Sequence, residues 1–312
     1  MCFTLPMNKN LALKYLFLLF GILCISWSAI FVKMAGISGL GSAFYRLFIG
    51  TLGIIPIWFM GKRSKINFQS FKIAVICGVI FACDLALWNT SILLTKAAVS
   101  TLLANLAPIW VGLGSLLFFK EKPHTVFWTG ALVALAGVAI IMGFKNIIHI
   151  NNATGAYLAI SASIFYGAYL LTVRHGRSTL DTITFTGISM ATSSVILFIL
   201  CLAFHTKLTG FSVKTWASLS GLGLISQLSG WLAINYALRY IKPTIASVSL
   251  LSQSVFTALL SVPVLHEILS TTEILGTFLV LSGIYLVNRE NFKERVQIAK
   301  LISVRIFKKS MN

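Results

Sequence analysis

The chain has 312 residues and a mass of 34.1 kDa; 57% of its residues are hydrophobic, only 10% are charged, and the mean hydropathy is +0.91. Because soluble domains carry roughly 25% charged residues, this composition excludes a water-soluble enzyme, a disordered tail and a nucleic-acid-binding module. The 25 Lys and Arg residues against seven acids give a net charge of +18, which in a membrane protein indicates basic cytoplasmic loops rather than contact with DNA or RNA.

Ten apolar runs follow one another along the chain, each near the length of about 20 residues that a spanning helix needs. The expected spans are 13–32, 42–60, 73–94, 98–119, 126–144, 154–173, 182–204, 215–238, 244–264 and 272–288. The third and fourth runs are divided at residues 95–97, because a single helix there would be too long for a bilayer. The loops are too short to hold a soluble domain. The sequence therefore predicts an all-α, multi-pass membrane protein.

Basic residues are distributed unevenly between the two sides of the predicted membrane. With a cytoplasmic N-terminus, 19 Lys and Arg residues lie inside, five lie outside and Arg46 lies within the second span. This asymmetry predicts that both termini are cytoplasmic, and we expect a bacterial cytoplasmic (inner) membrane. The first run is too long for a signal-peptide core and lacks an Ala-x-Ala ending, so we expect it to be the first span.

A shift of 146 positions superimposes the middle of the chain on its end without gaps. The matched pairs include Asn89 with Asn235, Lys96 with Lys242, Glu121 with Glu267, Gly130 with Gly276, and Gly137 with Gly283. We expect one five-helix repeat in residues 1–145 and a second in residues 153–289. Because five is odd, the second copy enters the membrane upside down. The expected fold is ten transmembrane helices in two inverted-topology five-helix repeats, an architecture typical of secondary transporters.

The tail, residues 290–312, differs from the rest of the chain. Apolar residues recur in it at helical spacing, and Lys and Arg occupy much of what lies between them. This pattern predicts a basic amphipathic helix on an anionic cytoplasmic leaflet. A solvated tail is the alternative.

Several stretches resemble the EamA-type members of the drug/metabolite transporter superfamily. They are SWSAIFVK at 26–33, FYRLFIG at 44–50, DLALWNTSI at 84–92, and NYALRYIKPTIASVSLL at 235–251 followed by Glu267. The resemblance covers all ten spans and leaves out only the tail. It implies an exporter or exchanger whose central cavity is lined by spans one, three, four, six, eight and nine, with spans five and ten at the periphery.

Asp84 is the one acid near the middle of a predicted span. A carboxylate at that depth is paired, protonated or hydrated, so it could couple transport to protons, anchor a substrate ammonium group, or pair structurally with Arg46. Arg46 could snorkel to the outer interface or pack between helices. If it instead faces a cavity, it suits a carboxylate, and together with Asp84 it would match a zwitterion.

The eighth span carries Gln227, Trp231 and Asn235 on one side, a mixture of hydrogen-bonding and flat apolar groups that suits a small-molecule site; helix packing is the alternative. Further candidate wall residues are Trp27 and Ser28 in span one, Trp88 and Asn89 in span three, Asn105 in span four, Tyr166 in span six and Gln253 in span nine. Pro108 would kink span four, either as a hinge for alternating access or as a static bend.

The sequence offers no pattern for catalysis, a metal or a cofactor. Its five cysteines lack metal-type spacing. His266 beside Glu267 has no helical partner at i+4, so we expect Glu267, like its repeat mate Glu121, to be structural. No intramembrane-protease motif or P-loop is present. The expected function is secondary active export of a small amino-acid-like or drug-like metabolite, with protons as the candidate coupling ion. Uptake or exchange by the same fold is the alternative, an intramembrane enzyme is the competing class, and the oligomeric state is open.

Overall fold

The computed structural model describes residues 9–60, 66–94, 97–142, 153–176, 180–265 and 270–310, and these are helical throughout apart from short connections. Within them, ten helical segments are long and apolar enough to cross a membrane. The segments are Ala12–Ala35, Gly39–Met60, Phe68–Ser91, Ser100–Phe119, Thr125–Met142, Ala153–Gly176, Thr182–Ala203, Val213–Leu238, Pro243–Val264 and Thr271–Glu290. The predicted number and order of spans are confirmed.

Four of the spans are not single α-helices. The first repeat contains α1 (Lys9–Ser26), α2 (Ser28–Ala35), α3 (Gly39–Met60), α4 (Phe68–Leu94), α5 (Ala97–Ala104), α6 (Ala107–Phe119) and α7 (Thr125–Met142). The second contains α9 (Ala153–Gly176), α10 (Thr182–Ala203), α11 (Val213–Gly221), the π-helix η1 (Leu222–Gly230), α12 (Trp231–Leu238), α13 (Pro243–Leu250), α14 (Ser252–Leu265) and α15 (Thr271–Ser310). Spans one, four and nine are thus interrupted, and span eight changes its helical pitch.

Local sequence signals explain several helix ends. Asp181 accepts a hydrogen bond from the Thr184 backbone N–H at 2.9 Å and caps α10. Ser270 and Glu273 form a reciprocal capping box at the start of α15, with bonds of 3.3 and 2.7 Å. Gly36 ends α2 in the left-handed region, at φ 62°.

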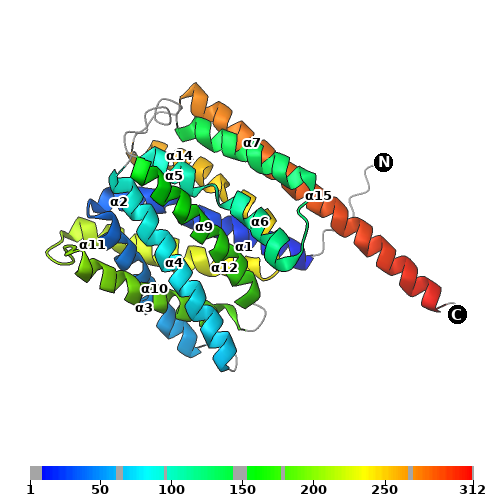
Figure 1. The fold of residues 1–312 in the computed structure, drawn as a ribbon, viewed down its shortest axis with the longest axis horizontal. Helices are drawn as coiled ribbons and strands as arrows, with labels where there is room; N and C mark the ends of the chain where they lie inside the picture. Colours follow the sequence, from blue (N-terminus) through cyan, green and yellow to red (C-terminus); the bar gives the residue numbers. More distant parts are fainter. Residues whose placement is uncertain are drawn as a thin grey trace.

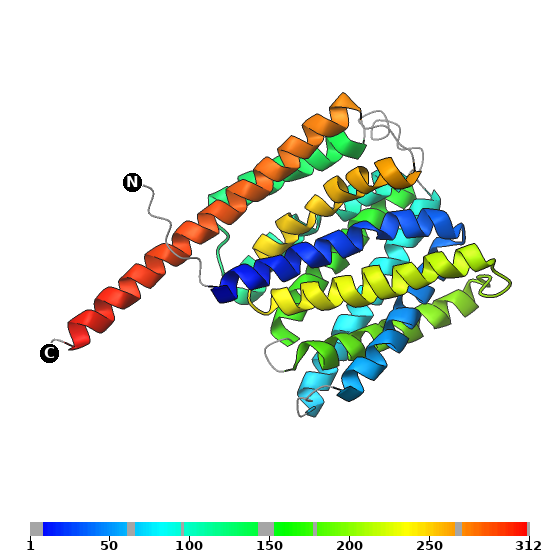
Figure 2. The ribbon, with the colours of Figure 1, turned by 180° about the vertical axis from the view of Figure 1, so that it is seen from behind.

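The main helix contacts in the bundle join the first repeat to the second. α4 packs along α9, α1 packs along η1 and α12, and α3 packs against α10. The paired helices α7 and α15 lie side by side at one edge of the bundle in both views (Figures 1 and 2). Spans five and ten are therefore peripheral, as the resemblance implied.

The contact between α7 and α15 carries the symmetry of the repeat. A Cβ on Gly137 would lie 2.6 Å from the carbonyl oxygen of Gly276, and a Cβ on Gly130 would lie 2.8 Å from that of Gly283. Gly137 matches Gly283 and Gly130 matches Gly276 in the repeat, so the two contacts exchange when the repeats exchange. The residue order is antiparallel, which places the pseudo-two-fold axis across the helices, in the membrane plane.

α15 continues as one helix from the tenth span through Ser310 and projects beyond the bundle (Figure 1). The tail is therefore helical to Ser310 and continuous with the span. Lys96, His266 and Glu267, which entered the repeat and the search for a metal or proton site, lie outside the described residues.

Candidate functional site

Arg46 of α3 is buried, with 8% of its surface exposed, and its Nε donates a hydrogen bond of 2.6 Å to Oε1 of Gln227 in η1. The side chain therefore does not snorkel to the outer interface. It instead packs between helices and joins span two to span eight. Because Gln227 is neutral, this contact orients the guanidinium without neutralising its charge.

Two glycines allow α3 and η1 to approach closely at this point. Gly50 lies one turn after Arg46 on α3, and a Cβ there would come within 3.0 Å of Cγ of Gln227. Gly223 lies one turn before Gln227, and a Cβ there would come within 2.6 Å of Cβ of Ile49. Without side chains at these two positions, the backbones come together and the Gln227 amide reaches Arg46.

Asp84 of α4 lies seven residues before Ser91, the last residue of its span, and Arg46 lies seven residues after Gly39, the first residue of its own. Both positions face the same end of the bundle in the predicted topology, so the two charges lie at similar depth. Asp84 is 8% exposed and interacts electrostatically with Arg46. In the described part of the chain, however, no ion pair within 4.0 Å joins them, and Asp84 has no hydrogen-bond partner.

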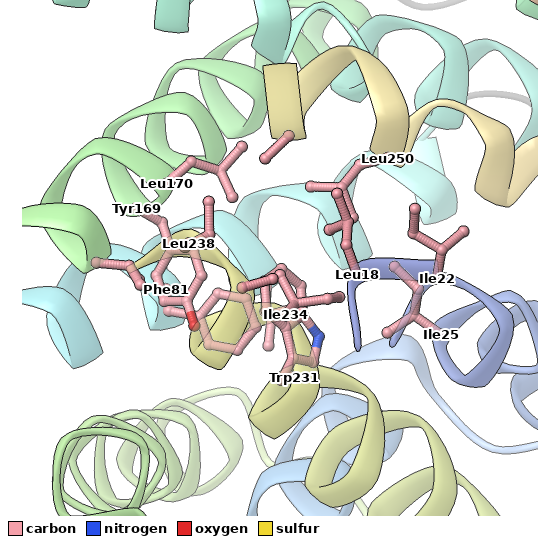
Figure 3. Packing of buried hydrophobic residues seen from close by; sticks show 14 of the residues in the cluster. Leu18, Ile22, Ile25, Phe81, Tyr169, Leu170, Trp231, Ile234, Leu238 and Leu250 are labelled. Atoms are coloured by element: carbon pink, nitrogen blue, oxygen red, sulfur yellow. The ribbon is translucent and has the colours of Figure 1, made fainter. Parts of the chain in front are cut away.

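Four aromatic side chains from three spans surround this region. Figure 3 shows Phe81, Tyr169 and Trp231 close together; Phe81 stacks on Tyr169, and Trp231 lies edge-on to both. The ring centroids are 4.5 Å apart for Phe81 and Tyr169, 5.0 Å for Phe81 and Trp231, and 5.1 Å for Tyr169 and Trp231. Tyr166 lies edge-on to Trp231 at 6.1 Å. Tyr166 and Tyr169 also interact electrostatically with Asp84 and Arg46.

Among the described residues, five buried polar side-chain atoms have no hydrogen-bond partner. They are Ser28 Oγ, Trp88 Nε1, Ser115 Oγ, Gln227 Nε2 and Trp231 Nε1. Three are N–H donors, and Trp88 lies one turn from Asp84 on α4. Because buried donors are nearly always bonded, donors left open beside an unpartnered carboxylate are what a site for a polar ligand requires. Asp84, Arg46, Gln227, Trp231 and the aromatic rings around them are called the polar-aromatic cluster below.

The two asparagines that the repeat matches have different surroundings. Asn89 Nδ2 donates to the backbone oxygen of Leu85 in its own helix at 2.6 Å. Asn235 Nδ2 donates to Thr186 Oγ1, and its Oδ1 accepts from the Tyr169 hydroxyl, both at 3.1 Å. Asn235 thereby links spans six, seven and eight.

A second group of candidates lies where the helices are interrupted. Asn105 lies between α5 and α6, and its Nδ2 donates to Ser254 Oγ of α14 at 3.5 Å. Thr257 of α14 donates to the backbone oxygen of Ser26 at 2.8 Å, next to the interruption at Trp27. The interruptions of spans one, four and nine are thus joined through α14.

The remaining candidates fall around these interruptions. Trp27 is half-buried and stacks on Phe31 with ring centroids 5.7 Å apart. Pro108 stands in the first turn of α6, just beyond the interruption of span four. Gln253 is half-buried in the first turn of α14.

An ion pair lies away from the cluster. Arg174, near the end of α9, donates two hydrogen bonds of 2.9 and 2.8 Å to the carboxylate of Glu121. These bonds hold the pKa of Glu121 below its ordinary value; partial burial opposes this effect, and the positive charges of Arg174 and Lys242 add to it. Glu121 therefore joins the end of span four to Arg174 of span six, a structural contact.

Sequence reasoning missed Tyr169 and Thr186. Tyr169 follows Tyr166 by three residues and so shares its helix face, a signal that could have identified it. Thr186 gave no such signal, because its role depends on how α10 is rotated against α12. No group of three or more His, Cys, Asp or Glu side chains that could hold a metal occurs in the described ranges.

Comparisons with known proteins agree with this architecture. The model of the EamA-like transporter family matches residues 12–143 and 153–289. The chain is 23% identical over 266 residues to the uncharacterized transporter YwfM of Bacillus subtilis, covering 83% of this chain and 87% of that protein. It is 22% identical over 277 residues to a protein of Streptantibioticus cattleyicolor named a "probable terminal-alkyne amino-acid exporter", covering 87% and 92%.

A solved crystal structure shares this fold. It superimposes with a TM-score of 0.74 at 16% sequence identity and covers 88% of this chain and 97% of that one.

Proposed function

The chain belongs to the EamA-like transporter family and is a multi-pass membrane transporter, and we propose that it exports a small amino-acid-like metabolite by secondary active, alternating-access transport driven by protons. The observation that carries the proposal is the polar-aromatic cluster. It combines a buried carboxylate, Asp84, which interacts electrostatically with the buried Arg46, with the open N–H donors of Gln227 and Trp231.

The chemistry of the cluster favours a zwitterion. Asp84 offers acceptor oxygens for an ammonium group, while Gln227 Nε2 and Trp231 Nε1 offer donors for a carboxylate. Arg46, which is bonded to Gln227, adds a positive charge near these donors, and that charge favours a carboxylate. The rings of Phe81, Tyr166 and Tyr169 supply the apolar surface that small-molecule sites combine with a few polar groups. The relative named as an amino-acid exporter supports the same substrate class.

Asp84 is also the proposed proton carrier. A carboxylate in the bilayer costs about 2.5–3.5 kcal/mol, and here no direct ion pair or hydrogen bond among the described residues compensates that cost. Protonation removes the charge, so Asp84 can lose its proton on one side of the membrane and regain it on the other as the repeats exchange conformations.

The basic charges support the proposed arrangement in a bacterial cytoplasmic membrane, with both termini inside. We assign the two repeats to residues 1–145 and 153–289. The tail from residue 290 follows as a cytoplasmic helix whose basic residues favour an anionic leaflet.

Reconstituted transport tests the proposal. Purified protein in liposomes with an imposed proton gradient is assayed with neutral amino acids, with their methyl esters, which lack the carboxylate, and with N-acetyl derivatives, which lack the ammonium group. We expect amino acids to move against their own gradient and both derivatives to move at least tenfold more slowly. Right-side-out vesicles then give the direction of transport.

Asp84→Asn is the matching variant. It keeps the shape of the side chain and removes the ionisable group, so we expect gradient-driven transport to fall at least tenfold and the residual rate to become independent of pH between 5.5 and 8. Normal transport by this variant across that range would exclude Asp84 as the proton carrier. Absence of movement of any amino acid by the folded wild-type protein would reject the proposed substrate class.

A further inference from the structure

Arg46 has two possible partners in the polar-aromatic cluster, and the structure shows it bound to the neutral one. Its Nε bonds Gln227 Oε1 at 2.6 Å, whereas Asp84 interacts with it only at longer range. An arginine and a carboxylate that are both buried ordinarily form a direct, often bidentate pair. Here the bond from Nε to Gln227 orients the guanidinium instead.

We propose that Gln227 is a positioning residue that keeps Arg46 out of a direct ion pair with Asp84, so that Asp84 can exchange a proton during transport. The inference rests on the proposed function, because it concerns the proton step at the same site. It adds a second role for Gln227: its Oε1 acts on the proton step through Arg46, whereas its Nε2 is the group proposed to meet the substrate.

The glycines of α3 and η1 fix the position of the Gln227 side chain. Gly50 leaves the space in which Cγ of Gln227 lies, and Gly223 lets the backbone of η1 reach Ile49. The π-helix contributes as well, because its wider turn rotates Gln227 relative to an α-helical register. These features aim the Gln227 amide at Arg46.

The repeat mates of two of these residues are not polar. Under the shift of 146 positions, Gln227 corresponds to Phe81 and Asp84 to Gly230. The crossing of α4 with α10 therefore has no amide where the crossing of η1 with α3 has Gln227. A polar group present in one repeat only is expected of a functional group placed on a symmetric frame.

No other charged group competes for this role among the described residues around Asp84. The titratable side chains that interact with Asp84 are Arg46 from α3, Tyr166 and Tyr169 from α9, and Cys83 beside it on α4. Phenols and thiols ordinarily remain neutral between pH 5.5 and 8. The position of Arg46 is then what sets how readily Asp84 takes up a proton.

The test compares two substitutions at one position by the pH dependence of proton-driven transport in liposomes. Gln227→Leu removes the acceptor, so Arg46 is free to pair with Asp84, and the pH midpoint of transport should move toward acid by about 1–3 units. Gln227→Glu gives Arg46 a charged partner instead, so the midpoint should stay or move toward alkaline pH. A residue that serves packing alone would change the rate in both variants without an acid shift confined to Gln227→Leu.

A second pair of variants reaches the same contact from α3. Gly50→Ala places a methyl group 2.5 Å from the end of the Met190 side chain and 3.0 Å from Cγ of Gln227, so a smaller shift toward acid is expected. Gly53→Ala, three residues further along α3, is the control. A Cβ there would meet the side chains of Leu224 and Leu228, so we expect the pH midpoint to stay unchanged.

The outcomes separate the inference from the proposed function. If wild-type transport does not respond to the proton gradient, the proposed function fails. If the wild type responds but neither Gln227→Leu nor Gly50→Ala moves the midpoint, the positioning role of Gln227 is wrong and the proposed function stands. Gel filtration and thermal midpoints in detergent establish whether each variant is folded. If Gln227→Leu does not fold, the pH midpoint of Gly50→Ala tests the positioning role of Gln227.

Discussion

Two arginines show how the surroundings of a residue decide what its charge does. Arg174 is 30% exposed and binds the carboxylate of Glu121 through two hydrogen bonds near the end of a span. Arg46 is buried and bonds a neutral amide. The exposed pair can form and break with little cost because water screens it, whereas the buried arginine must be held by the structure around it.

The exposed ion pair leads to a prediction about acid stability. Because the folded state lowers the pKa of Glu121, the pair stabilises the protein above the ordinary glutamate pKa of about 4.3, and this stabilisation is lost as the pH falls through the lowered value. Glu121 is 40% exposed, so after solvent screening the effect is about 0.2–1 kcal/mol.

Arg174→Gln should therefore lower the thermal midpoint in detergent at pH 7, and its difference from the wild type should disappear as the pH falls below the lowered pKa of Glu121. Lys122→Gln removes a nearby exposed charge that makes no such pair and is the control. A difference that persisted unchanged as the pH was lowered would show that Arg174 stabilises the protein by some other contact.

At the scale of elements, the interruptions of spans four and nine are related by the repeat. Span four is interrupted at residues 105–106 and span nine at Leu251, and Asn105 corresponds to Leu251 under the shift of 146 positions. Helices interrupted at corresponding positions of two inverted repeats are typical of transporter binding sites. Pro108 predicted the first interruption; its repeat mate is Ser254, so the second carries no proline signal.

An interrupted helix leaves backbone carbonyls that need partners, and Thr257 provides one for Ser26. Thr257→Val keeps the side-chain shape and removes the donor, so we expect the free energy of unfolding to fall by about 1–2 kcal/mol. Thr90→Val is the matched control, because the Thr90 hydroxyl is exposed and bonds within its own helix at 2.7 Å. Equal losses in the two variants, measured by thermal unfolding in detergent, would contradict a role for the interhelical bond.

At the scale of the whole molecule, the pair α7 and α15 joins the two repeats at the edge of the bundle. Its glycine contacts are backbone to backbone and exchange under the pseudo-two-fold axis. Such close packing resists separation, so we expect this pair to stay together while the other spans change their arrangement during transport.

The symmetry makes a quantitative prediction. Gly137→Ala and its repeat mate Gly283→Ala each place a methyl group against backbone atoms of the facing helix, so both should lose about 1–3 kcal/mol of stability, by similar amounts. Gly187→Ala is the control, because the nearest atom to a Cβ there is 3.5 Å away. Thermal unfolding midpoints in detergent measure these losses of stability. Markedly unequal losses in Gly137→Ala and Gly283→Ala would show that the interface is not symmetric.

The sequence determined the number of spans, their order and the repeat, because the cost of placing polar groups in lipid acts on each segment separately. It also identified Asp84, Arg46, Gln227 and Trp231 as residues of interest, since each is unusual where it stands. Hydropathy and residue spacing do not depend on which helices become neighbours.

Only the tertiary structure decided which of these residues meet. That Arg46 bonds Gln227 rather than Asp84 depends on the rotation of span eight through its π-helix and on the close approach that Gly50 and Gly223 allow. The sequence placed Asn235 with the substrate candidates, and the structure bonds it to Tyr169 and Thr186. Contacts of this kind are set by helix rotation and depth across residues more than a hundred positions apart, which local pattern does not encode.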